Sequence, residues 1–270
     1  MQNFHVLQTN NIWYGSFPVL EQAGFIHGCS CRLNGTSDVA TGTLNLALHV
    51  GDNPKLVIEN RNLFAKALGV AADKFTTCQQ IHGSKVVRVT EELIGSGAVS
   101  FSDTVADTDA LICNIPNVPL MLFYADCVPV LLADQETGAV GLAHAGWRGT
   151  VAKIAKKTLA AMTAEFGTKP EDIIAAIGPF IGQCCYQVDD FVKNQAVGYE
   201  EFFAPKEEHG KYMLDLWSYN VKQLTECGVA EENIAVAGVC TAHNSELFCS
   251  YRAEKGKTGR MGVCLAARRI

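Results

Sequence analysis

The sequence Val128-Pro129-Val130-Leu131-Leu132-Ala133, followed by Ala139-Val140-Gly141-Leu142-Ala143-His144-Ala145, decides the fold. Both runs are apolar and short, so each predicts a buried strand. The intervening Gln135-Glu136-Thr137-Gly138 is typical of a turn, and the two strands are therefore predicted to pair as a hairpin. In that hairpin Cys127 enters the first strand at the edge where His144 leaves the second. We therefore expect these two side chains to converge.

A second histidine extends this pair to a candidate metal site. His82 lies in Gln79-Gln80-Ile81-His82-Gly83, between two alternating runs, so we expect a turn between strands with Gly83 as its pivot. Three protein ligands leave a tetrahedral zinc ion one open position, as in catalytic sites. Cu2+ would accept the same nitrogen and sulfur donors. The residues also suit a cysteine nucleophile with a histidine base, and the sequence leaves both uses open.

Hydrophobic patterning along the rest of the chain predicts an α+β fold. Helices are expected at residues 54–68, at 150–166, from 189 or 190, and at 214–227, with Gly69, Gly167 and Gly228 as stop signals. Further strands are expected within 24–33, 75–80, 85–90, 109–113, 119–124, 173–177, 234–239, 247–252 and 261–266. Because strands outnumber helices and form hairpins, we expect a mixed β-sheet sandwich with flanking helices. No linker divides the sequence, so residues 1–270 are predicted to form a single catalytic domain.

Composition and charge exclude several classes of function. Hydrophobic residues make up 48% of the chain and charged residues 19%, which is typical of a folded globular protein. The net charge of −6, with no basic block, argues against binding to nucleic acid or an anionic membrane. The apolar run at 118–125 is too short to span a bilayer, and no export signal is visible. Eleven cysteines in such a chain predict reduced thiols and a cytoplasmic location.

Short motifs in a fixed order through nearly the whole chain carry a resemblance to a known family. In chain order they are Ser30-Cys31-Arg32, Leu44-Asn45-Leu46, Val50-Gly51-Asp52, Glu59-Asn60-Arg61, Gln80-Ile81-His82-Gly83, Asp107-Thr108-Asp109-Ala110, Ala125-Asp126-Cys127-Val128-Pro129, His144-Ala145-Gly146-Trp147-Arg148-Gly149-Thr150, Ile177-Gly178-Pro179, Cys185-Tyr186-Gln187-Val188, Cys240-Thr241, Ser250-Tyr251-Arg252 and Thr258-Gly259-Arg260. On this ordered series the chain resembles the family once called multicopper polyphenol oxidases. That family is now described as zinc-dependent purine nucleoside phosphorylases, and also as peptidoglycan editing factors.

The resemblance implies a metal-dependent enzyme with transferase and hydrolase activities. By it, His82, Cys127 and His144 match the family's zinc ligands. The implied reactions are phosphorolysis of adenosine, inosine, guanosine and methylthioadenosine, and hydrolytic deamination of adenosine. Its partners would be a small nucleoside and phosphate, and we expect a monomer. The chain departs from the family pattern at Leu33-Asn34-Gly35-Thr36-Ser37, which replaces a glycine-rich segment, and at Phe248-Cys249, which replaces paired phenylalanines.

Three further residues are candidates for holding the substrate. Arg148 lies two residues before the expected 150–166 helix, where backbone N–H groups and a guanidinium could bind an anion together. Arg32 is a second candidate, and Asn45 is a candidate hydrogen-bond partner for the ribose or for metal-bound water. Arg148 could instead cap a helix or bridge carboxylates on the surface, and Arg252 and Arg260 could be structural ion-pair partners. Asp126 is interpreted either as a partner of the adjacent ligand or as a turn cap.

Other functions compete with the nucleoside chemistry. With Cys127 as nucleophile and His144 as base, the chain would be an amidase acting on muramyl-peptide precursors of peptidoglycan. A zinc amidase would use the same metal site. A blue-copper oxidase is disfavoured, because its histidine-rich trinuclear cluster is difficult to build from 7 histidines of which two lie in strong motifs.

Overall fold

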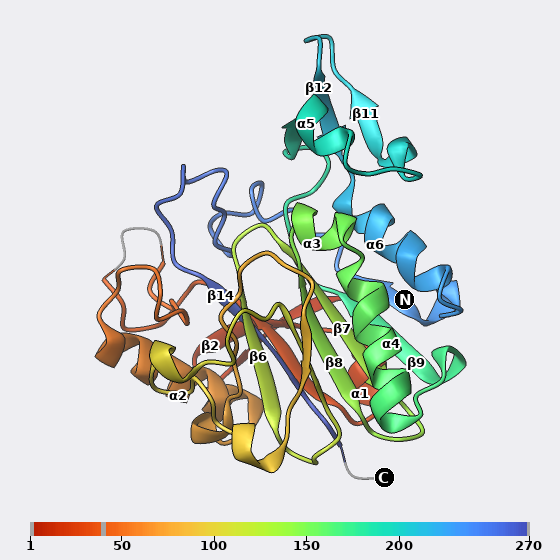
Figure 1. The fold of residues 1–270 in the computed structure, drawn as a ribbon. Coiled ribbons are helices and arrows are strands. Elements are labelled where there is room, and N and C mark those ends of the chain that lie inside the picture. The colour runs from red at the N-terminus through yellow and green to blue at the C-terminus, as the bar shows by residue number, and fades with distance from the viewer. Residues whose placement is uncertain (1–2, 39–41, 269–270) are drawn as a thin grey trace.

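Two β-sheets packed face to face form the centre of the molecule, with helices on both outer faces (Figure 1), in a computed structural model that describes residues 3–38 and 42–268. The first sheet has the strand order β1 (His5–Thr9), β2 (Ile12–Ser16), β3 (Ile26–Ser30), β14 (Met261–Ala266), β6 (Pro119–Tyr124), all antiparallel. The second sheet is mixed, in the order β13 (Ile234–Val236), β9 (Ile173–Ile177), β7 (Val128–Asp134), β8 (Val140–Ala145), β5 (Ala110–Cys113), β4 (Val86–Arg88). The α+β sandwich predicted from the sequence is confirmed.

Alternation along the central strands divides the core into layers. In β7, Leu131 and Ala133 face the first sheet, whereas Val130 and Leu132 face the helices. This period of two is what a strand covered on both faces requires. Of the helices, α2 (Pro54–Leu68) covers the outer face of the first sheet, and α4 (Ile154–Phe166) and α6 (Leu216–Thr225) cover that of the second.

The remaining elements are short and lie around this sandwich. They comprise the helices α1 (Pro18–Gln22), α3 (Trp147–Val151) and α5 (Asp190–Lys193), and the 3-10 turns Ala72–Lys74, Glu91–Leu93, Phe101–Asp103, Pro170–Asp172, Glu200–Phe202 and Glu231–Asn233. A small sheet, β10 (Gln187–Asp189), β12 (Lys211–Leu214) and β11 (Phe203–Pro205), projects with α5 from the top of the molecule in Figure 1. No helix in the described residues is both long and apolar enough to cross a membrane.

The predicted hairpin forms as expected. β7 and β8 pair antiparallel with Leu131 opposite Leu142 and Pro129 opposite His144. The turn lies at residues 135–138, where Gly138 has the positive φ that completes it. Helix α2 also has the predicted bounds, with Asn53 as N-cap and Gly69 as a left-handed C-cap.

Several local predictions are wrong. The single helix expected at 150–166 is two helices, α3 and α4, because the backbone turns at Lys153, which has a left-handed φ of 61°. The expected strands at 75–80 and 247–252 are extended loops and turns, of which only Thr76 and Cys78 form isolated bridges. Each segment buries apolar side chains, among them Phe75 and Phe248, which gives it the composition of a strand. In residues 75–80 the backbone hydrogen bonds are divided among several segments, since Thr76 bonds with β6 whereas Thr77 bonds with two loops.

Candidate metal centre and active site

The β7–β8 hairpin directs Cys127 and His144 to the same end of the space between the two sheets. His144 shares a face of β8 with Leu142, and Cys127, just before β7, packs against the same inter-sheet core. The ring of Tyr124, from β6 of the first sheet, contacts His144 with centroids 5.4 Å apart. Ligand atoms of His82, Cys127 and His144 all lie within 4.8 Å of one another. The structure therefore brings together the three residues selected from the sequence.

His82 is held by an unusual turn. It has a φ of 61°, so the left-handed residue of the turn is His82, whereas the predicted pivot, Gly83, has no such backbone. This conformation is costly for a residue with a side chain and is found preferentially at functional sites. The turn points three consecutive N–H groups at the carboxylate of Asp109, from Ile81 (3.2 Å), His82 (2.9 Å) and Gly83 (2.7 Å).

Asp109 also orients His144. One carboxylate oxygen lies 2.9 Å from His144 Nδ1, so this nitrogen carries the proton and Nε2 is left for the site. Although burial opposes ionisation, the hydrogen bonds from His144 and from the turn lower the pKa of Asp109. The carboxylate is therefore the common support of two of the three clustered side chains.

The electrostatics of the site favour a thiolate. Burial alone would raise the pKa of Cys127, but the adjacent His144 and His82 lower it. Burial correspondingly lowers the pKa of His144, but Cys127 and Asp109 outweigh that effect and raise it. A deprotonated sulfur is the form that both binds metals and acts as a nucleophile.

Gly146 lies opposite Cys127 at the open end of the β7–β8 hairpin. Because it has no side chain, it leaves space for His82, Cys127 and His144. A Cβ at this position would lie 3.0 Å from Cys127 Sγ and 3.2 Å from His82 Cδ2. The N-cap of α3 is therefore kept free of a side chain where the three donor side chains meet.

The donor set fits a divalent zinc ion or copper. Two imidazoles and a thiolate are ligands that both ions accept, and Asp109 supplies the second-layer carboxylate that metal-binding histidines usually have. In the described part of the chain, no fourth histidine, cysteine or carboxylate joins the group, so a tetrahedral ion here would keep one position open.

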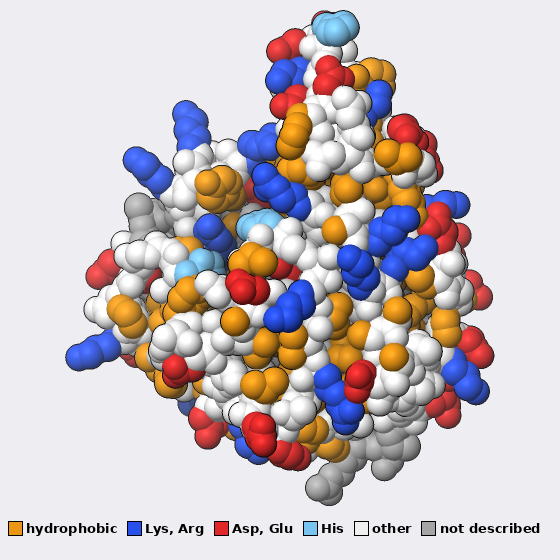
Figure 2. All heavy atoms as spheres, in the orientation of Figure 1, with side chains coloured by type: hydrophobic (Ala, Val, Ile, Leu, Met, Phe, Trp, Pro, Cys, Tyr) orange, Lys and Arg blue, Asp and Glu red, His pale blue; other side chains and the backbone are white. Residues whose placement is uncertain are grey.

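The cluster opens into a cavity of about 530 Å³, a volume suited to a small-molecule ligand. Aromatic rings and three arginines predominate among the residues that line it, which are His49, Gln80, His82, Phe123, Ala125, Asp126, Cys127, His144, Trp147, Arg148, Tyr186, Tyr251, Arg252 and Arg260. The face drawn in Figure 2 shows a hollow bordered by histidine, Lys or Arg and hydrophobic side chains. A flat aromatic ligand could stack on the rings, and an anion could bind to the guanidinium groups.

Arg148 lines this cavity, as its predicted role requires. It lies in the first turn of α3, exposed, with its guanidinium 4.4 Å from the Trp147 ring centroid. Arg252 and Arg260, which the sequence left as possible structural residues, line the same cavity. The cationic wall is therefore larger than predicted.

The other two candidates lie outside the cavity wall. Arg32 is buried, donates to the carbonyls of Ser245 and Phe248, and pairs with Glu254 at 2.8 Å. Asn45 is also buried; its side chain donates to Asp52 and accepts the backbone N–H of Arg260 at 2.9 Å. Both residues brace the loops that carry the cavity rather than facing it.

Asp126 connects two loops through hydrogen bonds. Its carboxylate accepts one hydrogen bond from the Thr241 hydroxyl and one from the Arg252 N–H, each at 2.7 Å. The φ of Asp126 is 83°. Of the two interpretations from the sequence, this geometry favours a backbone role, because Asp109 is the carboxylate that contacts a clustered histidine.

Sequence reasoning missed the roles of Asp109 and Gln80. The Gln80 amide donates to the carbonyl of Phe123 and accepts its N–H, both at 2.8 Å, which fixes that cavity residue from a distant loop. The sequence places Asp109 in a motif but does not indicate its contact with His144. A carboxylate just before a strand has many common structural uses, so its position alone predicts no role.

Known proteins are similar to this chain over most of its length. Residues 26–268 match the family described as "Multi-copper polyphenol oxidoreductase laccase". The chain belongs to this family. The chain is also 38% identical over 243 residues to a protein of Geobacillus stearothermophilus named "Purine nucleoside phosphorylase YlmD", covering 88% of this chain and 89% of that one. A Bacillus subtilis protein of the same name is 36% identical over 239 residues, covering 87% and 86%.

Solved structures share the fold over its full length. YlmD from Geobacillus stearothermophilus superposes with a TM-score of 0.91 at 35% identity, covering 100% of both chains. A Bacillus licheniformis structure titled "hypothetical protein YfiH" gives a TM-score of 0.92 at 33% identity, covering 99% of this chain and all of that one. The chain is therefore a member of an enzyme family whose curated relatives carry the purine nucleoside phosphorylase name.

Proposed function

We propose that this chain is a zinc-dependent purine nucleoside phosphorylase that also deaminates adenosine. The observation that carries the proposal is the convergence of His82, Cys127 and His144 on one wall of a cavity whose other walls hold arginines and aromatic rings. Relatives named for this activity support the substrate class. Adenosine, inosine, guanosine and methylthioadenosine are the nucleosides we expect it to accept.

The chain's own residues divide the work of phosphorolysis. Arg148, with Arg252 and Arg260, would hold phosphate by charge-assisted hydrogen bonds, while Phe123, Tyr186 and Tyr251 offer faces for the purine. An oxygen of hydrogen phosphate forms a bond to the ribose C1′ as the C1′–N9 bond breaks. The electron pair of that bond leaves with the purine, which takes up the proton that the hydrogen phosphate gives up. Bound zinc would act as a Lewis acid at the open position, which both phosphorolysis and deamination can use. Asp109 keeps the Nδ1 proton on His144 throughout, so Nε2 stays directed at the site.

The test is a metal-controlled assay on the purified chain. We expect about one zinc ion per chain at this site, and formation of adenine and ribose 1-phosphate from adenosine and phosphate. A chelator should abolish both this reaction and the formation of inosine, and added zinc should restore them. Cys127→Ser should lose the activity and the site's metal, whereas Cys227→Ser, a half-buried thiol outside the cavity lining, should lose neither. Adenosine turnover that survives complete removal of metal would refute the zinc mechanism.

One observation favours a second candidate. Without metal, Cys127, His144 and Asp109 form the thiolate, imidazole and carboxylate series of a cysteine hydrolase. An amidase of muramyl-peptide precursors could use this series, or the same zinc. Cleavage of a muramyl-serine amide without any nucleoside turnover would favour it. A covalent adduct on Cys127, detected by mass spectrometry, would separate the nucleophile from the zinc version.

The copper-oxidase description of the family has less support in this chain. Apart from the cavity cluster, the described residues contain one other group of metal-binding side chains, and it has a single histidine. A trinuclear copper cluster requires many more imidazoles. Copper at the cavity cluster would therefore be a substitute for zinc without the redox partners of an oxidase.

A further inference from the structure

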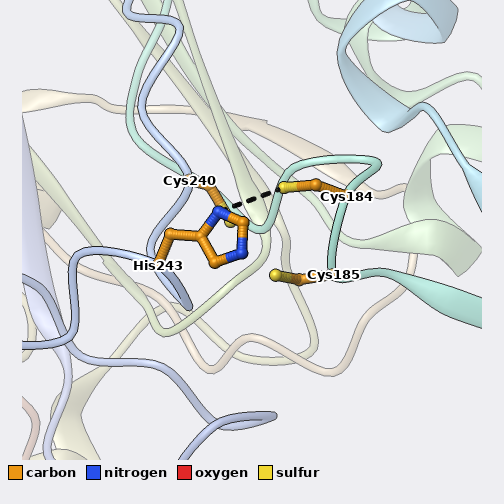
Figure 3. A group of neighbouring side chains, drawn as sticks. All are labelled: Cys184, Cys185, Cys240 and His243. Carbon is orange, nitrogen blue, oxygen red and sulfur yellow. Dashed lines mark hydrogen bonds between the residues drawn. The ribbon is translucent and has the colours of Figure 1, made fainter.

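A second cluster of metal-binding side chains lies outside the cavity lining. Cys184 and Cys185 come from the loop between β9 and β10, and Cys240 and His243 come from the loop between β13 and β14. Their three sulfurs and a ring nitrogen all lie within 4.8 Å of one another. Figure 3 shows the four side chains turned toward a common centre, with Cys184 Sγ 3.5 Å from His243 Nδ1. We propose that Cys184, Cys185, Cys240 and His243 form a second, structural zinc site.

The composition and spacing of the cluster match such a site. Structural zinc is normally held by four protein ligands, and three cysteines with one histidine are a recurrent set. In a tetrahedron with usual zinc–sulfur and zinc–nitrogen lengths, neighbouring donor atoms lie about 3.6–3.8 Å apart. The separation of Cys184 and His243 already has this scale. The sequence alone gives only a weak indication of this site. Its ligands are the adjacent Cys184 and Cys185 and the distant pair Cys240 and His243, whereas zinc sites usually show Cys-x-x-Cys pairs.

The backbone around the four side chains stabilises the sulfur of Cys240 and lets the two loops approach. The Gly182 N–H lies 3.2 Å from Cys240 Sγ, a hydrogen bond of the kind that supports ligand atoms in metal sites. A Cβ on Gly182 would lie 3.2 Å from both Cys184 Sγ and Cys240 Cβ, so this glycine lets the two loops approach. Cys184 and His243 are exposed, which gives an ion access from solvent.

The position of the cluster indicates what the ion would do. The two loops meet at the Phe180–Cys240 bridge, and the Thr241 N–H donates to the Phe180 carbonyl at 2.9 Å. Thr241 Oγ1 then holds Asp126, next to Cys127, while Tyr186, next to Cys185, lines the cavity. A zinc ion at this point would fasten together two loops that build one side of the cavity wall. This site does not depend on the proposed function, since its role is to hold the fold.

The main competitor is a disulfide between Cys184 and Cys240. It would remove two of the four ligands, so the two states exclude each other. Mass spectrometry of the native protein under non-reducing conditions, with thiols blocked at lysis, distinguishes them. Three thiols outside any disulfide, at Cys184, Cys185 and Cys240, either free or protected by metal, support the zinc site; a Cys184–Cys240 crosslink in freshly isolated protein overturns the proposal.

Cobalt substitution in the full-length chain tests the site directly. The sulfur-to-cobalt charge-transfer absorption grows with the number of thiolates bound, so the two clusters have different signatures. In Cys127→Ser, which disables the cavity cluster, we expect one Co2+ per chain with three thiolates, displaced by one Zn2+. Adding Cys184→Ser and Cys240→Ser should remove that ion, whereas adding Cys227→Ser should not.

Two outcomes would overturn the proposal. One is a Cys127→Ser chain that binds no cobalt, and the other is a bound ion with fewer than three thiolates. His82→Ala provides a second background that should behave as Cys127→Ser does, in case the serine variant folds poorly. Zinc should also raise the thermal unfolding temperature of the Cys127→Ser chain but not that of the variant lacking Cys184 and Cys240.

Discussion

At the scale of single residues, Asp109 does more than its place in the sequence indicates. Its buried carboxylate accepts three N–H groups from the His82 turn and the Nδ1 proton of His144. An amide in its place has one oxygen to accept these bonds and would turn an N–H₂ group toward donors. The residue therefore decides both the turn conformation and the histidine tautomer.

Asp109→Asn should weaken the cavity metal site without unfolding the chain. We expect metal affinity to fall about 10–100-fold, as for other carboxylates that support metal-binding histidines. The unpaired buried groups should reduce the free energy of unfolding by about 1–3 kcal/mol. Competition with a chelator measures the first effect and urea unfolding the second. Asp107→Asn is the control, because Asp107 is exposed and asparagine tolerates its left-handed backbone. Equal metal affinity in the two variants would contradict the role of Asp109.

Gly146→Ala tests the space around the donor atoms. The backbone φ of −64° suits alanine, so any effect comes from the new Cβ, 3.0 Å from Cys127 Sγ. We expect the thiolate to be displaced, the cavity site to lose metal affinity, and the thermal unfolding temperature of the metal-free chain to stay nearly constant. Metal titration and calorimetry provide the two readings. Wild-type metal affinity in this variant would mean that the sulfur can move at no cost.

Cys127 should react as a thiolate when metal is absent. Because His144 and His82 lower its pKa while burial raises that of Cys227, iodoacetamide should modify Cys127 at lower pH than Cys227. Zinc should protect Cys127, and His144→Ala should move its reaction to higher pH. Peptide mass spectrometry across a pH series measures each site separately. Identical pH profiles for the two cysteines would show that the histidines do not stabilise the thiolate.

Much of this site follows from the sequence, for a physical reason. Cys127 and His144 flank two apolar runs joined by a short turn, and hairpin pairing fixes which side chains share a face. The roles of Asp109 and Gln80, and the second metal site at Cys184, Cys185, Cys240 and His243, depend on contacts between segments that are far apart in the chain. No local pattern encodes those contacts, so they became visible only in three dimensions.

At the scale of secondary-structure elements, local signals worked where the chain caps its own helices. Asn53 and Gly69 fixed α2, since each satisfies or permits terminal backbone geometry by itself. The continuous apolar stripe over 150–166 concealed the break at Lys153, whose left-handed backbone no propensity predicts for lysine. That break ends α3 after a single turn and leaves Arg148 at the cavity.

His27 in β3 makes the contact between β3 and α1 sensitive to pH. Its Nε2 accepts the Phe17 N–H at 2.9 Å, and its Nδ1 lies 3.0 Å from the Phe25 carbonyl, so the ring is neutral with the proton on Nδ1. Burial lowers its pKa, only partly offset by the Phe25 carbonyl and Glu21. As the pH falls, the His27 imidazole is therefore protonated in the unfolded chain before it is protonated in the folded chain. The stabilisation that a neutral His27 provides is complete above its pKa of 6.5 in the unfolded chain and is lost as the pH falls below that value.

His27→Gln should flatten that pH dependence. Glutamine cannot titrate but can still accept the Phe17 N–H, so the free energy of unfolding should fall less between about pH 7 and about pH 5.5 than in the wild type. Urea unfolding at several pH values measures the slopes. His209→Gln, at an exposed position, should keep the wild-type slope. If His27→Gln and the wild type lose stability in parallel, His27 is not protonation-sensitive in this range.

At the scale of the whole molecule, the charge of the cavity opposes the charge of the chain. The net charge is −6, yet Arg148, Arg252 and Arg260 line the cavity. Asp126, the carboxylate in that lining, already accepts two hydrogen bonds from the loops. The cavity therefore attracts an anionic substrate, whereas the remaining surface repels it. Salt screens both interactions, and it screens those of exposed charges most strongly.

If phosphate binds at this wall, its KM should rise with ionic strength and depend on Arg148. Loss of a charge-assisted hydrogen bond costs about 1.5–3 kcal/mol, so Arg148→Gln should raise the KM for phosphate about 10–100-fold and reduce its salt dependence. The KM for the nucleoside should change much less. Arg88→Gln removes the same charge from the distant strand β4, where Arg88 pairs with Glu165, and should leave both KM values near wild type. Equal effects of the two substitutions would mean that phosphate responds to net charge and that Arg148 makes no direct contact with it.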